Sequence, residues 1–411
     1  MAAMTASPSA APVFDIAVVG AGAAGLALAA VIKREAGVKL KIALIGPETP
    51  GDGRLRTVAL SPGSRSLIER LGAWTRLSAE AQPILEMAIF DGALNDAVRL
   101  EQMRFSGSAS APLAWMAYND DVTEALARSA ESAGVERIVG AVADFAVERY
   151  VAALTLTDGR TIKARLVAAA DGSRSKLRAL ADIPTTTWST GQSGIVATIA
   201  HERDHEGRAE QHFLPAGPFA MLPMKGRRSN IVWNESPEAA ERFCVAPEWE
   251  FIEELERRFS PRLGALSLVG EARAFPLEFR FARRYVAERL ALVGDAAHLV
   301  HPLAGQGLNL GLRDVAALAE IVVERLRLGL DPGDGETLAE YQRLRRFDAL
   351  TSGLGMDAMN RLFSTDFAAV RSLRDLGLRV VDRAGPLKGR LIAEAAGEGG
   401  GAPKLLRGLG L

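Results

Sequence analysis

The sequence predicts an α/β fold in which a domain with a parallel sheet is interleaved with a mainly β-sheet domain and followed by a helical C-terminal region. Three observations lead to this prediction. The ordered chain begins with a strand, a glycine-rich turn, a helix and a second strand; residues 184–281 are mostly strand-like; and residues after Asp314 are mostly helical. Alternation of strands and helices favours a parallel sheet, whereas a run of short strands favours a separate β-layer.

The composition is typical of a folded protein with two or three domains, at ~150 residues per domain. The chain has 411 residues, of which 48% are hydrophobic, and its 49 basic residues nearly balance 50 acidic ones. A net charge of -1 gives no general attraction to nucleic acid or to an anionic membrane. The single cysteine, Cys244, excludes a disulfide framework and a CxxC metal or redox site.

Residues 1–13 predict a flexible leader without a targeting signal. They are small or Pro/Ser-rich and include no lysine or arginine, so they lack the basic region of a signal peptide and the arginines of a transit peptide. No apolar run of the chain approaches the ~20 residues that cross a bilayer. We therefore expect a cytoplasmic protein.

The first glycine-rich turn predicts a dinucleotide site. A β-branched apolar strand over residues 15–19 is followed by Gly20, Gly22 and Gly25, then by a helix and a strand over residues 39–45. In this pattern the first glycine permits the tight turn, the second lets the backbone approach a pyrophosphate, and the third lets the helix pack on the sheet. The alternative is a tight turn that serves packing alone.

One expected residue is missing from this unit. An acidic residue should end the second strand and bind the adenosine ribose, but Gly46 stands there. Glu48 lies two residues further on and could take this role, or it could be an ordinary surface residue, because Pro47 leaves its direction open.

Short strands with Gly and Asp turns are expected over residues 83–103, and a helix over residues 120–134 that Asp120 or Asp121 could cap. Residues 145–169 predict a hairpin that leads into a buried strand.

The second motif follows that buried strand. Asp171 and Gly172 form a turn signal, and Ser175 and Arg178 come next at helical spacing. Taken alone, this pattern indicates only a strand, a turn and a capped helix.

The third motif, residues 294–314, follows a short apolar strand over residues 290–293. Asp295 ends that strand, where a carboxylate can accept hydrogen bonds from sugar hydroxyls, while Gly305 and Gly307 free the backbone to approach a flat ring. The helix that follows directs the positive end of its dipole at that ring, which suits negative charge developing there.

The same motif contains a weaker alternative. Asp295, His298 and His301 could form a metal cluster, but Pro302 and the glycines disrupt a helical ligand face. We therefore predict no metal site.

With its three motifs in this order, the chain resembles the FAD-dependent aromatic hydroxylases, and among them the UbiH-type hydroxylases of ubiquinone biosynthesis. That branch typically shows GDAAHxxHPLAGQGLNLGLRD, which residues 294–314 match throughout. Further matching segments are residues 56–61, 213–218 and 359–364, and the tail over residues 376–378 and 403–407. The resemblance covers nearly the whole chain from Asp15 and implies a Rossmann-like FAD-binding domain, a mainly β-sheet substrate domain and a C-terminal helical region.

The resemblance implies the following domains. The FAD-binding domain comprises residues 14–82, 104–183 and 285–345, the substrate domain comprises residues 83–103 and 184–284, and the C-terminal helical region comprises residues 346–411.

The resemblance also implies FAD as cofactor and NAD(P)H as reducing co-substrate. It places Arg56 near the ribityl-pyrophosphate region, Asn119 on the ribityl chain and Asp295 on the ribityl hydroxyls, while Asp171 and Arg178 belong to a motif that handles FAD and NAD(P)H. The cofactor-binding residues implied are Gly20, Gly22, Gly25, Arg56, Asn119, Asp171, Arg178, Gly294, Asp295, Pro302, Gly305, Gln306, Gly307, Leu308 and Asn309. No catalytic side chain follows, because the flavin carries the chemistry; His301 and Pro302 lie near its ring by resemblance.

By the same resemblance, the chain hydroxylates the aromatic ring of a polyprenylphenol intermediate with O2, through a C4a-hydroperoxyflavin. Phe213, Phe219, Met221 and Trp233 could line the prenylphenol site, or they could be ordinary sheet core. Two alternatives stay open: a flavin hydroxylase of another aromatic compound, and a weakly catalytic assembly subunit of a quinone-biosynthesis complex, which the departure at Gly46 favours.

The C-terminal segment suggests a peripheral contact with the inner face of the membrane. Its basic residues are Lys388, Arg390, Lys404 and Arg407, and they stand among Leu405, Leu406 and Leu409. A basic amphipathic segment can lie on a bilayer, but a helix packed on its own domain with a solvated basic face is an equally good interpretation.

Overall fold

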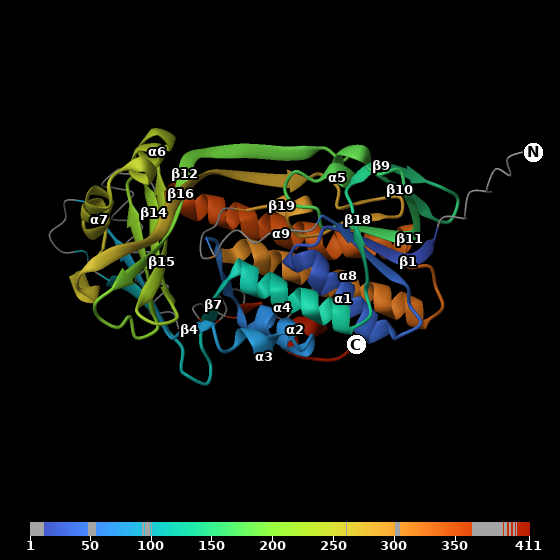
Figure 1. Ribbon diagram of the computed structural model, residues 1–411, viewed down its shortest axis with the longest axis horizontal. Helices are drawn as coiled ribbons and strands as arrows, with labels where there is room; N and C mark the ends of the chain where they lie inside the picture. Colours follow the sequence, from blue (N-terminus) through green and yellow to red (C-terminus); the bar gives the residue numbers. More distant parts are fainter. Residues whose placement is uncertain are drawn as a thin grey trace, which may run out of the picture.

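The computed structural model describes residues 12–47, 55–92, 94, 99, 101–259, 261–300, 305–363, 389, 393, 396, 397, 399 and 401–411. It has two large sheets at opposite ends of an elongated molecule, with a layer of long helices beside the first sheet (Figure 1). The predicted α/β fold class is confirmed. No helix in these residue ranges is long and apolar enough to cross a membrane. Glu48, His301, Pro302, Lys388 and Arg390 lie outside the described residues.

The first sheet has eight strands, and its central part is parallel. Its main path is β17 (Val286–Ala287), β18 (Leu290–Leu292), β11 (Thr161–Ala169), β1 (Val13–Val19), β2 (Ile42–Gly46) and β8 (Glu136–Val139); β10 (Ala152–Leu156) pairs with β11, and β9 (Val142–Val147) pairs with β10. Within the hairpin predicted for residues 145–169, β10 and β11 pair antiparallel. Because β18, β11, β1 and β2 run parallel, their carboxyl ends place all three glycine-rich motifs at one edge of the sheet.

Three helices lie side by side against this sheet: α1 (Ala23–Ala36) packs between α4 (Asn119–Ser132) and α8 (Gln306–Arg327) (Figure 1). A methyl group at Gly311 would lie 3.3 Å from Cα of Gly294 and 3.9 Å from Cβ of Ala24, so only a small residue fits where α8, the third motif and α1 meet. Shorter helices are α2 (Pro62–Arg70), α3 (Trp74–Leu77) and α5 (Lys176–Leu180), with 3-10 turns η1 (Pro261–Leu263) and η2 (Gly294–Ala296).

The second sheet also has eight strands and is mainly antiparallel. Its order is β19 (His298–Leu299), β16 (Leu266–Ala282), β12 (Thr185–His201), β15 (Arg228–Glu235), β14 (Gly217–Met224), β13 (Arg208–Leu214), β5 (Glu86–Asp91) and β6 (Glu101–Ser106). β12 and β16 span 17 residues each and run from this sheet back toward the first one (Figure 1). A small sheet of β3 (Thr57–Leu60), β7 (Ala114–Tyr118) and β4 (Gln82–Ile84) lies between the two.

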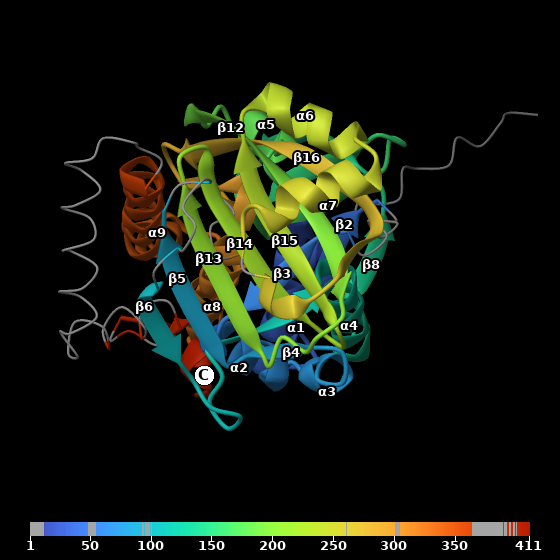
Figure 2. The same cartoon turned by 90° about the vertical axis from the view of Figure 1, so that its left-hand side faces the viewer.

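Two helices cover the outer face of the second sheet, as Figure 2 shows: α6 (Pro237–Val245) and α7 (Glu248–Glu256). The sequence reading of residues 184–281 as mostly strands omits both. The sequence does contain a helix-start signal for α6. Ser236 is the N-cap, whose hydroxyl accepts a hydrogen bond from the backbone amide of Ala239, and Pro237 occupies the first turn.

The capping prediction for α4 is wrong. The helix begins at Asn119, so Asp120 and Asp121 lie in its first turn, and Tyr118 occupies the N-cap position, where its side chain does not cap the helix. Two carboxylates in the first turn still interact favourably with the helix dipole.

The C-terminal residues pack into the core of the first domain. Helix α9 (Gly335–Phe363) is followed, after residues outside the described ranges, by the 3-10 helix η4 (Lys404–Arg407). Leu405 and Leu406 are 0% and 1% exposed, and the amide of Leu405 donates a 2.8 Å hydrogen bond to Glu320 of α8. Of the two interpretations of this segment, packing on its own domain is the one that the structure shows for Leu405 and Leu406.

The burial of η4 predicts a large stability effect. Leu405→Ala should lower the free energy of unfolding by about 3 kcal/mol, because it removes a fully buried side chain and leaves a cavity. Leu409→Ala is the matched control, since Leu409 is 50% exposed, and should cost less than about 0.5 kcal/mol. Urea unfolding of both variants checks this, and equal effects would contradict the packing of η4.

Candidate active site

A cavity of about 630 Å³ lies between the first sheet, the small sheet and the second sheet. Residues of all three motifs line it, together with one side of the second sheet. From the motifs come Gly22, Ala23, Ala24, Ala170, Gly172, Ser173, Gly294, Asp295, Gly305, Gly307, Leu308 and Gly311. Segments far apart in the sequence thus converge on one site.

The three glycines of the first motif occupy distinct environments. A Cβ at Gly20 would lie 2.1 Å from the carbonyl oxygen of Ala170, and one at Gly25 would lie 2.0 Å from the carbonyl oxygen of Gly20. These two positions exclude any side chain because the turn packs directly on β11. A Cβ at Gly22 would meet no atom within 4 Å, so this residue faces open space at the N-terminus of α1. That N-terminus has no side-chain cap and no acidic residue in its first turn, which leaves amide N–H groups for an anion.

The end of β2 shows why no acidic residue stands at Gly46. A methyl group there would lie 3.1 Å from the amide nitrogen of Ala21, tighter than most contacts, and 3.5 Å from Nη1 of Arg137. The exposed Arg137 side chain comes from the neighbouring strand β8 and donates a 2.7 Å hydrogen bond to the carbonyl oxygen of Pro47. The guanidinium of Arg137 thus lies beside Gly46, the position at which the first motif predicts a carboxylate. Sequence reasoning missed Arg137, because only the register of β8 against β2 brings it there.

Arg56 and Asn119 lie together on the cavity wall. The backbone amide of Asn119 donates a 2.9 Å hydrogen bond to the backbone carbonyl oxygen of Arg56, where β3 meets the end of β7. Beside them, the hydroxyl of Thr57 donates to Oδ1 of Asn230 on β15 at 2.9 Å, which links the small sheet to the second sheet.

Asp295 directs its carboxylate into the cavity. The residue is exposed on the cavity side, and its carboxylate accepts no hydrogen bond from the residues described. Enclosure by protein raises its pKa, an effect that His298 and Arg56 partly offset. A carboxylate in this state gains from hydrogen-bond donors on a ligand.

The buried Arg178 stabilises the turn that contains Asp295 from the side away from the cavity. Its guanidinium donates 2.8 Å hydrogen bonds to the carbonyl oxygens of Ala296 and Ser173, so it connects the second motif to the third. It is not among the residues that line the cavity. Asp171 accepts a 3.1 Å hydrogen bond from the amide of Leu177 through Oδ2, while its buried Oδ1 has no protein partner in the described part of the chain.

A buried ionic cluster, which sequence reasoning also missed, lies under the third motif. Asp314 of α8 is 0% exposed and accepts hydrogen bonds from the amide of Gly294 at 2.9 Å, from Nε2 of His298 at 2.7 Å and from Nε of Arg345 at 2.7 Å. Burial alone would raise the pKa of Asp314, but His298 and Arg345 lower it below its usual value. His298 thus pairs with this carboxylate.

The N-terminus of α8 also opens on the cavity. Gly305, its N-cap, has φ of 63°, and a Cβ there would lie 3.0 Å from the amide nitrogen of Ala59. A Cβ at Gly307 would meet nothing within 4 Å. Leu308 lines the cavity, whereas Gln306, the first residue of α8, does not.

The Asn309 side chain makes hydrogen bonds within the protein. Its Nδ2 donates to the carbonyl oxygen of Ala59 at 2.8 Å, and its Oδ1 accepts from the amide of Ser61 at 3.0 Å and the hydroxyl of Ser64 at 2.7 Å. Asn309 is 2% exposed, so it fixes α8 to β3 and α2 and does not reach the cavity.

The second sheet supplies the apolar wall of the cavity. Val196, Leu222, Val232, Phe275 and Leu277 line it. The sequence left Phe213, Phe219, Met221 and Trp233 open between the prenylphenol site and ordinary sheet core, and the structure shows them as core. Phe219, Met221 and Trp233 point to the opposite face, where they pack under α6 and α7, and Phe213 is buried away from the cavity. Side chains alternate along a strand, so choosing the neighbouring residue selects the wrong face.

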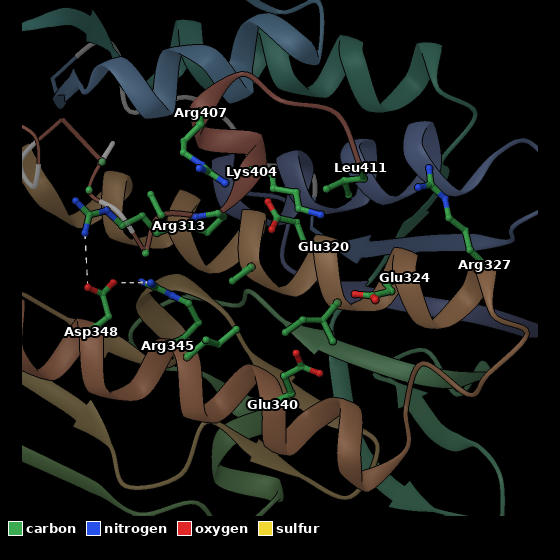
Figure 3. Close-up of a pocket in the computed structure, with 18 of the residues that line it drawn as sticks. Arg313, Glu320, Glu324, Arg327, Glu340, Arg345, Asp348, Lys404, Arg407 and Leu411 are labelled. Carbon is green, nitrogen blue, oxygen red and sulfur yellow. Dashed lines mark hydrogen bonds and ion pairs between the residues drawn. The ribbon is translucent and has the colours of Figure 1, made fainter.

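A second hollow, of about 720 Å³, lies between α8, α9 and the C-terminal residues (Figure 3). Carboxylates of Glu320, Glu324 and Glu340 and cationic groups of Lys404 and Arg407 line it. Of the three motifs, only Arg313 of the third contributes to its lining, and this charged lining is unsuited to an apolar ring. The cavity between the sheets is therefore the candidate active site.

Comparison with known proteins places the chain in a family. The sequence profile of the FAD binding domain family matches residues 13–349. The ubiquinone hydroxylase UbiL of Rhodospirillum rubrum is 42% identical, covering 98% of this chain and 95% of the relative. The 3-demethoxyubiquinol 3-hydroxylase of Escherichia coli is 33% identical, covering 93% of this chain and 98% of the relative. The chain belongs to the FAD-dependent hydroxylases of ubiquinone biosynthesis. The family resemblance inferred from the sequence is thereby confirmed.

Solved structures agree on the fold. The p-nitrophenol 4-monooxygenase PnpA of Pseudomonas putida has a TM-score of 0.77 at 18% identity, covering 95% of this chain and 99% of that one. HpxO of Klebsiella pneumoniae, in a variant complexed with FAD, has a TM-score of 0.71 at 18% identity, covering 94% and 99%.

The cavity fits FAD, the cofactor of this family. The helix N-termini of α1 and α8 offer uncapped amides for phosphates and for a ring that gains negative charge. Asp295, on the same cavity, offers a carboxylate for sugar-like hydroxyls. A Cβ built at Gly22 or Gly307 would meet no protein atom within 4 Å, so there is room for a ligand beside both backbones. The donor set therefore matches the phosphate, hydroxyl and ring groups of FAD.

The environment of Asp295 generates a binding prediction. Asp295→Asn should weaken FAD binding roughly 10- to 100-fold, because an amide cannot replace charge-assisted hydrogen bonds to the ribityl hydroxyls. Titration of apoprotein with FAD, followed by flavin fluorescence, measures this. Asp158→Asn, in the exposed turn between β10 and β11, is the control and should bind normally. Unchanged affinity in Asp295→Asn would contradict the ribityl assignment.

Arg137 generates a second binding prediction. Arg137→Ala should weaken FAD binding by about 5- to 20-fold, because it removes a donor from the adenosine end of the site. The same titration applies, with Arg128→Ala on the exposed side of α4 as control. The melting temperature of both apoproteins should match that of the wild type. If FAD affinity is unaffected while Arg137→Ala folds normally, the adenosine end does not use this cation.

Proposed function

We propose that this enzyme hydroxylates the aromatic ring of a polyprenylphenol intermediate of ubiquinone biosynthesis, using FAD, NAD(P)H and O2. One observation carries the proposal: a cavity that joins the three FAD motifs to an apolar wall, in a chain whose relatives over nearly its full length act on ubiquinone precursors. The polar half of the cavity suits the cofactor, and the apolar half suits a prenylated ring.

The proposed roles of the cofactor residues follow from their positions. Gly20, Gly22 and Gly25 hold the pyrophosphate against α1, and Arg56 and Asn119 lie along the ribityl-pyrophosphate region. Asp295 accepts the ribityl hydroxyls. The remaining members of the set act on the ring or support it: Gly294, Pro302, Gly305, Gln306, Gly307 and Leu308, with Asn309, Asp171 and Arg178 as supporting residues behind the cavity.

The chain's part in the reaction is to bind, orient and exclude water. When bound, FAD accepts a hydride from NAD(P)H and activates O2 for transfer of one oxygen atom to the ring. The N-terminus of α8 stabilises negative charge at the ring edge. Val196, Leu222, Val232 and Leu277 keep the reacting region apolar, which limits loss of the oxidant to water. Among the described residues, we assign no side chain as general base.

The domain roles are part of the same proposal. Residues 14–82, 104–183 and 285–345 would form the FAD-binding domain, residues 83–103 and 184–284 the substrate domain, and residues 346–411 the C-terminal helical region. Helix α9 runs through residue 345 without a break, so it links the first and last of these units. Because the substrate carries a lipid tail, we further propose peripheral contact with the inner face of the membrane; membership of a quinone-biosynthesis complex is a separate proposal.

The function is tested in the cell and in solution. Deletion of the gene should lower the ubiquinone pool and lead to accumulation of an under-hydroxylated polyprenylphenol, which mass spectrometry identifies. The wild-type gene should restore the pool, and the Asp295→Asn variant should restore it poorly. Purified holoenzyme should consume one O2 per hydroxylated product. An unchanged quinone pool with no accumulated intermediate would contradict the proposal, and restoration by a variant unable to bind FAD would favour the assembly role.

A further inference from the structure

Helix α9 carries an exposed face on which apolar residues recur at helical spacing. Leu344, Phe347, Leu354 and Leu362 are 51%, 73%, 48% and 45% exposed. Their spacings of three, seven and eight residues place them on one stripe of the helix. Large apolar side chains arranged in this way mark an interaction surface more often than an ordinary solvated face.

The charges beside this stripe are basic. Arg343 and Arg346 are exposed, and neither pairs with a carboxylate of the described chain. Of the acids on α9, Asp348 pairs with Arg345, Asp357 pairs with Arg361 at 2.9 Å, and Glu340 pairs with Arg325 of α8 at 3.3 Å. The exposed Glu336 lies about two turns before Leu344, at the start of the helix. The outward face of α9 is therefore both apolar and cationic.

The inward face of α9 packs on the wall of the active-site cavity. Leu350 and Met356 contact a cluster that includes Phe281 and Val300, and Val300 lines the cavity. A methyl group at Gly353 would lie 2.3 Å from Cζ of Phe281, so the helix lies as close as its backbone permits. A surface that covers the outward face would lie about one helix diameter, ~10 Å, from the cavity.

The charged hollow of Figure 3 opens beside the same face. Leu344 lines it from α9, and Lys404 and Arg407 contribute cationic groups from the opposite wall. Carboxylates of Glu320, Glu324 and Glu340 lie in the same hollow, so its lining is of mixed charge, and the leucines of η4 stay in the core.

We propose that this face of α9, with Leu344, Phe347, Leu354 and Leu362 as its apolar stripe, is the surface by which the enzyme lies on an anionic bilayer. The inference rests on the proposed function, since a lipid-borne prenylphenol is the substrate the enzyme must reach. An apolar stripe bordered by arginines matches acyl chains bordered by anionic headgroups.

Two other occupants fit the charges less well. A second copy related by two-fold symmetry would bring the same cationic face against itself. Residues 364–388 of this chain carry five basic and three acidic residues, so they have the same sign of charge. Anionic lipid complements both the stripe and its arginines.

Vesicle co-sedimentation of the full-length holoenzyme tests the proposal. The wild type should bind vesicles of phosphatidylglycerol and phosphatidylcholine, and bind pure phosphatidylcholine much more weakly. Phe347→Asp/Leu354→Asp should reduce partitioning by about tenfold or more, because two apolar side chains no longer enter the bilayer. Arg343→Glu should reduce it by about fivefold or more and make the remainder less sensitive to salt. Trp249→Asp is the matched control, since Trp249 is 67% exposed on α7, and should bind like the wild type.

If a second copy of the chain or residues 364–388 occupied this face instead of lipid, the same variants would give different results. Wild-type vesicle binding by Phe347→Asp/Leu354→Asp overturns the proposal, as does equal loss in Trp249→Asp. A change of oligomeric state in the double variant, with vesicle binding unchanged, assigns the face to a second copy. A drop of more than about 5 °C in its melting temperature assigns the face to the chain itself.

Failure of this inference and failure of the proposed function are separable. Hydroxylation of a water-soluble phenol with a short prenyl chain should be equal in the wild type and all three variants. A wild type that hydroxylates this phenol but ignores anionic vesicles overturns the membrane surface and leaves the function standing. A wild type that binds vesicles through α9 but hydroxylates neither phenol leaves the surface standing and overturns the function.

Discussion

The buried carboxylate of Asp314 is the interaction on which the active-site geometry depends. It accepts hydrogen bonds from the Gly294 amide, from His298 and from Arg345, so one side chain of α8 fixes the third motif, the start of β19 and helix α9 together. Breaking a buried pair of this kind typically costs about 3–5 kcal/mol, because the partner charges stay in the interior without compensation. Asp295 faces the cavity because this restraint holds its turn in place, together with Arg178, which donates a hydrogen bond to the carbonyl oxygen of Ala296.

A second constraint is the close approach of backbone around Gly294. This glycine has φ of 61°, a backbone conformation that favours glycine, and a Cβ built on it would lie 3.5 Å from Cβ of Ala24 and 3.7 Å from Cα of Gly311. The N-termini of α1 and α8 both reach the same cavity, which Asp295 also lines. The glycine content of the motifs is thus explained by two requirements: tight packing at Gly20, Gly25 and Gly311, and open space at Gly22 and Gly307.

Local features of the site could be predicted from the sequence, whereas features that depend on strand register could not. The strand, turn and helix around Gly20 depend on neighbouring residues, and so does the hairpin before Asp171. The cavity wall depends on which alternate residues of β14 and β15 face inward. The sequence could therefore not decide between cavity and core for Phe219 and Trp233, which are core, and it did not single out Leu222 and Val232, which face the cavity. Arg137 could not be linked to Gly46 without the β2–β8 pairing. The leucines of η4 form an amphipathic pattern with the basic residues beside them. Neighbouring residues in the sequence do not indicate that α2 and α8 cover these leucines.

The arrangement of charge in the cavity follows the cofactor more closely than any single motif does. Positive helix ends near Gly22 and Gly305 and the carboxylate of Asp295 all border this cavity. A ligand that carries phosphates, hydroxyls and an electron-accepting ring satisfies all three. The protein around Asp295 raises the pKa of its carboxylate, and hydrogen-bond donors on such a ligand act in the opposite direction, because they favour the charged form.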